Sequence, residues 1–122
     1  MTDLTQEIHE SPAEFIHPDD AQAAGGDLLD EVQAFELART FNALADPTRV
    51  RLISTLLNSE LCVFDLAALV GLTQSAVSHQ LRSLRDMRLV KSRRLGREIL
   101  YTLDDEHIRE LYQLGRSHIQ HR

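Results

Sequence analysis

An acidic residue and three histidines near the C-terminal end of the chain are side chains of the kinds that bind transition metals. In a regular α-helix, His118 and His121 share a face because they are three residues apart. His107 and His118 also share a face, since eleven residues turn a helix by about 1100°, but they lie roughly 16 Å apart along its axis. One helix therefore cannot bring both ends to a single ion. The four candidate ligands are Asp105, His107, His118 and His121.

Two antiparallel copies of this helix would solve the problem of distance. The acid and first histidine of one copy would meet the last two histidines of the other, and a two-fold axis would create two identical four-ligand sites. Three imidazoles and one carboxylate suit tetrahedral Zn²⁺, with Co²⁺ or Ni²⁺ as alternatives. Asp105 and His107 are about 200° apart in a regular helix, so the site requires Asp105 at the N-cap. The alternative is that the histidines are only exposed residues of an amphipathic helix.

A second segment combines helical periodicity with short or forked hydrogen-bonding side chains, which suit base edges and phosphates in a major groove. It follows Gly71, a residue suited to the turn between two helices, and no acidic residue lies between Asp65 and Asp86. We therefore expect the recognition helix of a helix-turn-helix here. Its predicted apolar stripe is Leu72, Val77, Leu81 and Leu84, and its predicted DNA-binding residues are Gln74, Ser75, Ser78, His79 and Arg82.

The charge of the chain is unevenly distributed. The net charge is −6, which is unusual for a protein that binds nucleic acid. Residues 1–36 contain ten acidic side chains and no Lys or Arg, whereas residues 82–97 contain seven basic side chains and one acid. The basic block directly follows the expected recognition helix, so we add three of its members to the predicted DNA-binding residues: Arg93, Arg94 and Arg97.

The order of the remaining elements predicts a mainly α chain with a small β-hairpin, which is a winged helix-turn-helix. Residues 1–26 are acidic and contain Pro and Gly, which predicts a flexible N-terminal tail, and residues 27–122 form the predicted DNA-binding and dimerisation domain. The expected elements are helices over 27–44, 47–57, 62–70 and 74–87, strands over 89–95 and 97–103, and a last helix that starts at Asp104–Asp105.

Four stretches of the sequence form a specific combination. They are Ala43-Leu44-Ala45-Asp46-Pro47-Thr48-Arg49, Glu60-Leu61-Cys62-Val63-Phe64-Asp65-Leu66, Thr73-Gln74-Ser75-Ala76-Val77-Ser78-His79-Gln80-Leu81, and Leu89-Val90 through Gly96-Arg97 to Tyr101. Together they resemble the ArsR/SmtB family of small metal-responsive repressors, and the resemblance covers roughly residues 28–122. It implies a homodimeric winged helix that binds a two-fold operator in double-stranded DNA and is released by an inducer, usually a metal ion. Many family members use the spacing found here for a metal site between their last helices.

A second metal site is an alternative suggested by the resemblance, because part of the family binds soft metals near Cys62. Here Phe64 stands where a second thiol is frequent, and the N-terminal segment has histidines but no cysteine. Arsenite and lead prefer several thiolates, so they are disfavoured. A mixed site of Cys62, Asp65, His9 and His17 remains open. The simpler interpretation is a small buried Cys62 and an Asp65 that only favours the first turn of a helix.

The leading hypothesis is therefore a zinc-responsive repressor that acts as a homodimer on DNA in the cytoplasm. We expect no membrane span, since no apolar run is long enough, and no catalysis, since no nucleophile is paired with a base. One alternative is a redox or soft-metal sensor acting through Cys62, and another is a constitutive architectural or protein-docking winged helix. The expected dimer face lies on the first and last helices of the domain: Leu28, Val32, Phe35, Ile108, Leu111 and Tyr112.

Overall fold

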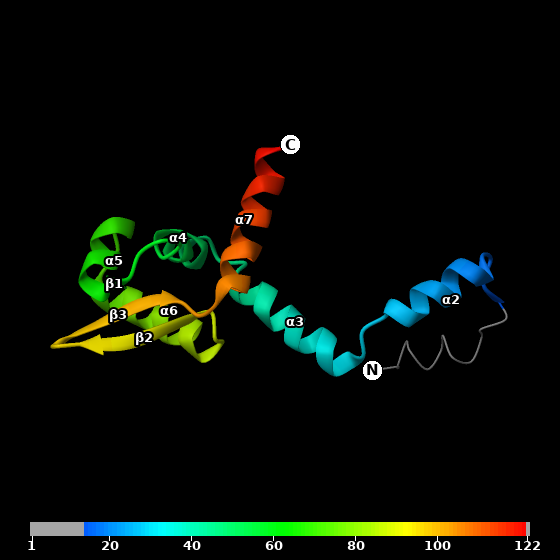
Figure 1. The fold of residues 1–122 in the computed structure, drawn as a ribbon, viewed down its shortest axis with the longest axis horizontal. Coiled ribbons are helices and arrows are strands. Elements are labelled where there is room, and N and C mark those ends of the chain that lie inside the picture. The colour runs from blue at the N-terminus through cyan, green and yellow to red at the C-terminus, as the bar shows by residue number, and fades with distance from the viewer. Residues whose placement is uncertain (1–13, 122) are drawn as a thin grey trace. The chain divides into compact units, whose positions relative to one another are not determined.

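The computed structural model describes residues 14–121, and chain contacts divide the protein into two units, residues 1–35 and 36–122. No helix in the described part is long and apolar enough to cross a membrane. The elements in chain order are α2 (Pro18–Asp27), α3 (Glu31–Ala43), α4 (Pro47–Thr55), β1 (Leu61–Cys62), α5 (Val63–Val70), α6 (Gln74–Asp86), β2 (Val90–Leu95), β3 (Glu98–Leu103) and α7 (Glu106–Gln120) (Figure 1).

The N-terminal unit contains α2 and the first turns of α3. Helix α2 begins with Pro18 followed by two aspartates, residue types that favour a first helical turn, and none of its residues is buried. The predicted tail over residues 1–26 thus includes most of a short helix. Helix α3 begins at Glu31 rather than near Asp27, because the Asp30 carboxylate accepts a hydrogen bond from the Gln33 amide and starts the helix there.

The core lies in the second unit, where α4, α5, α6, the sheet and the start of α7 bury their apolar side chains together. Three members of the predicted stripe on α6, Val77, Leu81 and Leu84, are completely buried. The fourth, Leu72, is 40% exposed, so its prediction was wrong. Leu72 precedes the helix in the turn after Gly71, where helical periodicity does not decide which side chains are covered.

The helix-turn-helix is formed by α5 and α6, whose ends have the expected chemistry. Gly71 ends α5 with φ of 73°, a left-handed conformation in which a side chain would be strained. The Thr73 hydroxyl oxygen then accepts a hydrogen bond from the Ala76 amide and caps α6. Figure 1 shows the β2–β3 hairpin beside α6, in the place of the wing.

The sheet has three antiparallel strands in the order β1-β3-β2, so the expected hairpin gains a third strand. Leu61 pairs with Tyr101, and Leu95 pairs with Glu98 at the tip of the wing. The loop at the tip is therefore Gly96-Arg97. Its φ of 63° at Gly96 fits a type II′ turn, whose first central residue is normally glycine.

Candidate DNA interface and metal ligands

The polar side of α6 has the exposure that a DNA-reading helix requires. Buried leucines and Val77 fix the opposite side of the helix in the core, while Gln74, Ser75 and His79 are exposed and Ser78 is half-buried. Arg82 is exposed one turn later. In the part of the chain that the structure describes, neither the Gln74 nor the Arg82 side chain has a hydrogen bond or ion pair that would hold it away from DNA.

The predicted basic residues of the wing have two different surroundings. Arg94 and Arg97 are exposed near the tip of the hairpin. Arg93 is instead paired with Glu60, which precedes β1: its Nε lies 2.6 Å from Glu60 Oε2 and its Nη2 lies 2.6 Å from Oε1. This double hydrogen bond lowers the pKa of the Glu60 carboxyl and raises that of the guanidinium. We did not predict a role for Glu60, and only its charge, opposite to that of the wing, could have suggested one.

The first pair of candidate metal ligands lies together at the start of α7. Asp105 has extended backbone angles at the N-cap, as the site requires, and its Oδ1 accepts hydrogen bonds from the amides of His107 (2.8 Å) and Ile108 (3.3 Å). Because Asp105 is outside the regular turns, the His107 Nδ1 comes within 3.4 Å of the same carboxylate oxygen. Both side chains are well exposed, so a metal ion has access to them.

The second pair lies at the other end of α7, with His118 in the last turn and His121 at the C-cap. The His121 Nδ1 lies 2.7 Å from the carbonyl oxygen of Ser117. Since a carbonyl only accepts hydrogen bonds, Nδ1 must carry a proton, and in the neutral ring Nε2 then has the lone pair that a metal needs. A ligating histidine normally has an outer partner of this kind.

The two pairs do not meet within one chain. Among the described residues, no three His, Cys, Asp or Glu side chains are close enough to hold a metal ion. This fits the helix geometry, which separates the ends of α7 by about 16 Å. The donor set and its exposure therefore suit zinc only if a second chain supplies the other pair.

The residues of the alternative site are less favourably placed. Cys62 is half-buried at the end of β1 and at the N-cap of α5, and Asp65 is exposed in the first turn of that helix. His17 precedes α2 in the N-terminal unit, and His9 lies outside the described residues. Among the described residues of the second unit, no third His, Cys, Asp or Glu side chain lies close enough to form a metal site with Cys62 and Asp65.

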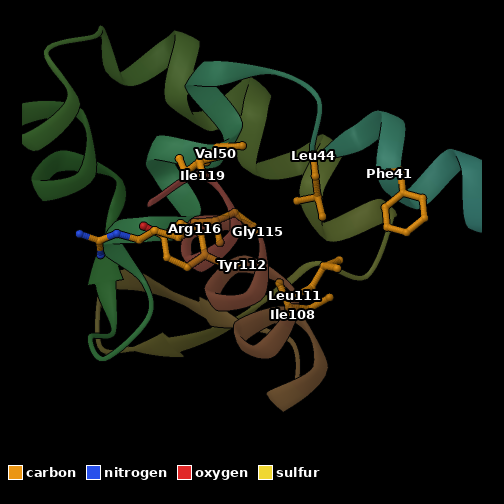
Figure 2. A pocket seen from close by; sticks show the side chains of 10 residues that line it. Phe41, Leu44, Val50, Ile108, Leu111, Tyr112, Gly115, Arg116 and Ile119 are labelled. Atoms are coloured by element: carbon orange, nitrogen blue, oxygen red, sulfur yellow. The ribbon is translucent and has the colours of Figure 1, made fainter. Parts of the chain in front are cut away.

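An apolar groove of about 420 Å³ runs between α3, α4 and α7 (Figure 2). Phe41 is 51% exposed and Val50 is 37% exposed, while Leu111 and Tyr112 from α7 are half-buried. Ile108, expected on the dimer face, is instead 9% exposed and belongs to the core. The first turn of α7 covers the chain's own core, and Ile108 in that turn also lines the groove beside the apolar side chains of the later turns.

A hydrogen-bonded contact that we did not predict joins α4 to the proposed recognition helix, α6. The Arg49 Nε donates a hydrogen bond to Gln80 Oε1 at 2.8 Å, and Nη1 donates one to the Ala43 carbonyl oxygen at 3.4 Å. In the sequence, Arg49 stands in one of the stretches that carry the family resemblance, but nothing there indicates its partner; in the structure it is half-buried.

Comparison with known proteins identifies relatives over most of the chain. The profile of the family described as bacterial regulatory protein, arsR family, matches residues 46–92. A transcriptional repressor SmtB homolog from Synechocystis sp. is 47% identical over 105 residues, which cover 86% of this chain and 80% of that protein. The HTH-type transcriptional regulator NmtR from Mycobacterium tuberculosis is 45% identical over 93 residues, which cover 76% of this chain and 78% of NmtR.

Solved structures share the same fold. The solution structure of apo-NmtR matches with a TM-score of 0.68 at 44% identity, over 78% of this chain and 80% of that one. A homodimeric winged helix-turn-helix DNA-binding domain from Mycobacterium bovis matches with a TM-score of 0.68 at 26% identity, over 76% of this chain and 88% of that domain.

Proposed function

This chain belongs to the ArsR/SmtB family of metal-responsive transcriptional repressors, and we propose that it is a zinc-responsive member that represses as a homodimer. The observation that carries the zinc proposal is the pair of ligand sets at the two ends of α7, with Asp105 beside His107 and His118 near His121. The proposed place of action is the cytoplasm, where the operator DNA lies.

The DNA-binding part of the proposal assigns the exposed side of α6 to the major groove. Gln74, Ser75, Ser78 and His79 would contact base edges near the start of the helix, and Arg82 would contact a phosphate or a base edge. Arg94 and Arg97 would contact phosphates or the minor groove from the wing. Arg93 is proposed as a weaker contributor, because Glu60 already neutralises its charge.

The dimer part of the proposal uses the apolar groove between α3, α4 and α7. A second copy would cover Phe41 and Leu111 and would bring the last helices together in antiparallel order. The homodimeric winged helix-turn-helix domain from M. bovis supports a homodimer. Each of two zinc sites would then take Asp105 and His107 from one chain and His118 and His121 from the other. Zinc would supply a rigid link between the two helices.

Repression and release follow from thermodynamic linkage. DNA favours the dimer shape in which two recognition helices reach successive major grooves about 34 Å apart. Zinc favours the shape in which the last helices are held by four ligands. If the two shapes differ, zinc weakens DNA binding, and DNA weakens zinc binding by the same factor. Family membership supplies the sign of this coupling.

The test is a fluorescence-anisotropy titration of a duplex from the chain's own promoter, with and without zinc. We expect tight binding without metal and at least a fivefold weaker binding with it, since coupling factors are typically about 5 to 150. Tight binding that no metal changes would indicate a constitutive DNA-binding protein. Binding that responds only to an oxidant or a soft metal would indicate sensing through Cys62.

The identity of the coordination is tested with cobalt in place of zinc. Four-coordinate Co²⁺ absorbs visible light far more strongly than six-coordinate Co²⁺, so an intense spectrum is expected. Addition of zinc should remove the spectrum, because zinc prefers the same tetrahedral site. A weak spectrum would instead favour a six-coordinate site of the kind that suits nickel.

A further inference from the structure

Arg49 is hydrogen-bonded to two other helices from its position in the first turn of α4. Its Nε donates to Gln80 Oε1 on α6 at 2.8 Å, and its Nη1 donates to the carbonyl oxygen of Ala43, the last residue of α3, at 3.4 Å. The carbonyls of the last helical turn lack partners within their own helix, so this one is open to an outside donor. One side chain thus connects the end of α3, the start of α4 and the middle of the recognition helix.

The position of Arg49 is itself fixed by the start of α4. Asp46 caps this helix, accepting hydrogen bonds from the amides of Thr48 at 2.8 Å and Arg49 at 3.4 Å, and Pro47 follows in the first helical position. The Arg49 side chain is half-buried, so its hydrogen bonds are partly shielded from water. A guanidinium donates in several fixed directions within one plane, which an ammonium group cannot reproduce.

Gln80 places this contact directly behind the surface proposed to read DNA. It follows His79 in α6 and is half-buried, whereas His79 is exposed. A hydrogen bond at Gln80 therefore restrains rotation and sliding of α6 without occupying the face proposed for base contacts.

The packing of the unit makes α4 one of two links between the proposed sites, the other being the route from α7 through β3 and β2 to α6. Helix α7, which carries the proposed zinc ligands, packs against α4 and β3, whereas α6 packs mainly against α5 and β2. Helix α4 packs against α7 and α5. Arg49 adds a polar connection from α4 to α6, and a second one to α3, which contributes Phe41 to the groove proposed for the dimer.

We propose that Arg49 is a positioning residue that sets the orientation of the recognition helix relative to α3 and α4, and that it transmits the effect of zinc to DNA binding. The second half of this proposal rests on the proposed function. The first half does not, because it concerns how the apoprotein presents α6. Arg49 itself need not touch DNA or metal.

The test compares the full-length Arg49→Lys and Gln80→Ala variants with the parent protein. Each should bind the promoter duplex about tenfold more weakly without zinc, the size of effect expected from losing a charge-assisted hydrogen bond. The ratio of the dissociation constants with and without zinc should fall toward one. Zinc affinity in the absence of DNA should be unchanged, which a general loss of structure would not allow.

A double-mutant cycle and a matched control separate positioning from other effects. The variant with both changes should be no worse than Arg49→Lys alone, since that change already removes the contact that Gln80→Ala removes. Gln80→Glu keeps an acceptor for Arg49. It should therefore retain the parent's ratio of DNA dissociation constants with and without zinc, even if its added charge weakens DNA binding. Arg51→Lys is the control: Arg51 is on the same helix, but its Nη1 donates to the Val70 carbonyl of α5 at 3.5 Å. Arg51→Lys should change the ratio of the DNA dissociation constants with and without zinc by less than twofold.

Additive single effects, or a normal promoter affinity and zinc ratio in Arg49→Lys, would overturn the proposal. Gln80→Ala keeps the test decisive if Arg49→Lys fails to fold, because Gln80 is only half-buried and its change leaves the core intact. If the parent protein itself does not respond to zinc, the proposed function fails. The affinities without metal and the double-mutant cycle then still decide whether Arg49 positions α6.

Discussion

Arg93 and Glu60 form a two-pronged ion pair that joins the wing to the segment before β1, with both nitrogen–oxygen distances at 2.6 Å. The two residues are 33 positions apart in the sequence. Their side chains are 55% and 30% exposed, so the pair adds little to stability on its own. Its geometric effect is larger, because a bidentate pair fixes the direction of both side chains. In the wing, Arg93 is therefore already paired with Glu60, whereas Arg94 and Arg97 are exposed and available for phosphates.

The salt dependence of DNA binding should distinguish these arginines. Each phosphate contact contributes about one unit to the slope of log affinity against log salt. We expect Arg94→Gln to reduce the slope by about one unit. The double variant Glu60→Gln/Arg93→Gln, which removes no net charge, should reduce the slope by much less than one unit. Gln74→Ala serves as a comparison, since it should alter sequence preference rather than slope. If the double variant loses as much slope as Arg94→Gln, then Arg93 leaves Glu60 to bind a phosphate.

The ion pair also predicts a pH dependence. Arg93 lowers the pKa of the Glu60 carboxyl below its ordinary value of 4.5. The stabilisation is therefore complete above that value, and it is lost as the pH falls through the lowered pKa of the folded protein. An NMR titration of the Glu60 carboxyl carbon should give a lower midpoint in the parent protein than in Arg93→Gln. Arg94→Gln is the matched control. A midpoint unaffected by Arg93→Gln would mean that the pair does not form in solution.

Asp105 has two roles under the proposal, and one substitution separates them. Asn caps helices about as well as Asp, so Asp105→Asn should leave the melting temperature of the metal-free protein nearly unchanged. It removes a carboxylate ligand, so zinc affinity should fall by at least about tenfold. Asp105→Ala should also lose about 1 kcal/mol of stability with the cap. Asp46→Asn changes another capping aspartate and should not affect zinc. Normal zinc binding by Asp105→Asn would remove this residue from the ligand set.

His118 and Cys62 provide the sharpest choice between the two candidate sensing sites. His118→Ala should still bind the promoter duplex, since α7 lies away from the proposed base contacts, but zinc should no longer weaken that binding. Cys62→Ser should keep its zinc response. Anisotropy titrations of both variants with and without zinc measure the difference. The reverse pattern, with Cys62→Ser unresponsive and His118→Ala normal, would place sensing at the start of α5.

Local patterns in the sequence predicted the elements of the second unit well. The three buried residues of α6 follow helical spacing, and Gly71, Thr73 and Asp105 have residue types that stop or cap helices, so each could be recognised from a few neighbours. Pairing between distant segments could not be recognised in this way. The pairing of Leu61 with Tyr101 turned an expected hairpin into a three-stranded sheet, because it depends on how the whole unit closes.

The candidate sites likewise divide into features that local sequence predicted and features that depend on tertiary structure. The exposed side of α6 followed from residue types at helical spacing, and Asp105 was expected at its observed N-cap. The pairing of Arg93 with Glu60 and the contact between Arg49 and Gln80 depend on tertiary structure. Ile108, assigned to the dimer face, packs in the core and also lines the groove, because the spacing of apolar residues in α7 does not tell which of them cover the chain's own core. The joining of the two ligand pairs stays a prediction.

Under the proposed function, the separation of the ligand pairs along α7 makes each zinc site depend on two chains. A chain with Asp105→Asn and His107→Ala and a chain with His118→Ala and His121→Ala would each be unresponsive as homodimers, since every site would lack one pair. In a mixed dimer, one site collects all the changes, and the other receives four intact ligands. Two defective copies in one cell should therefore complement each other. The purified mixed dimer should bind one zinc ion where the parent dimer binds two.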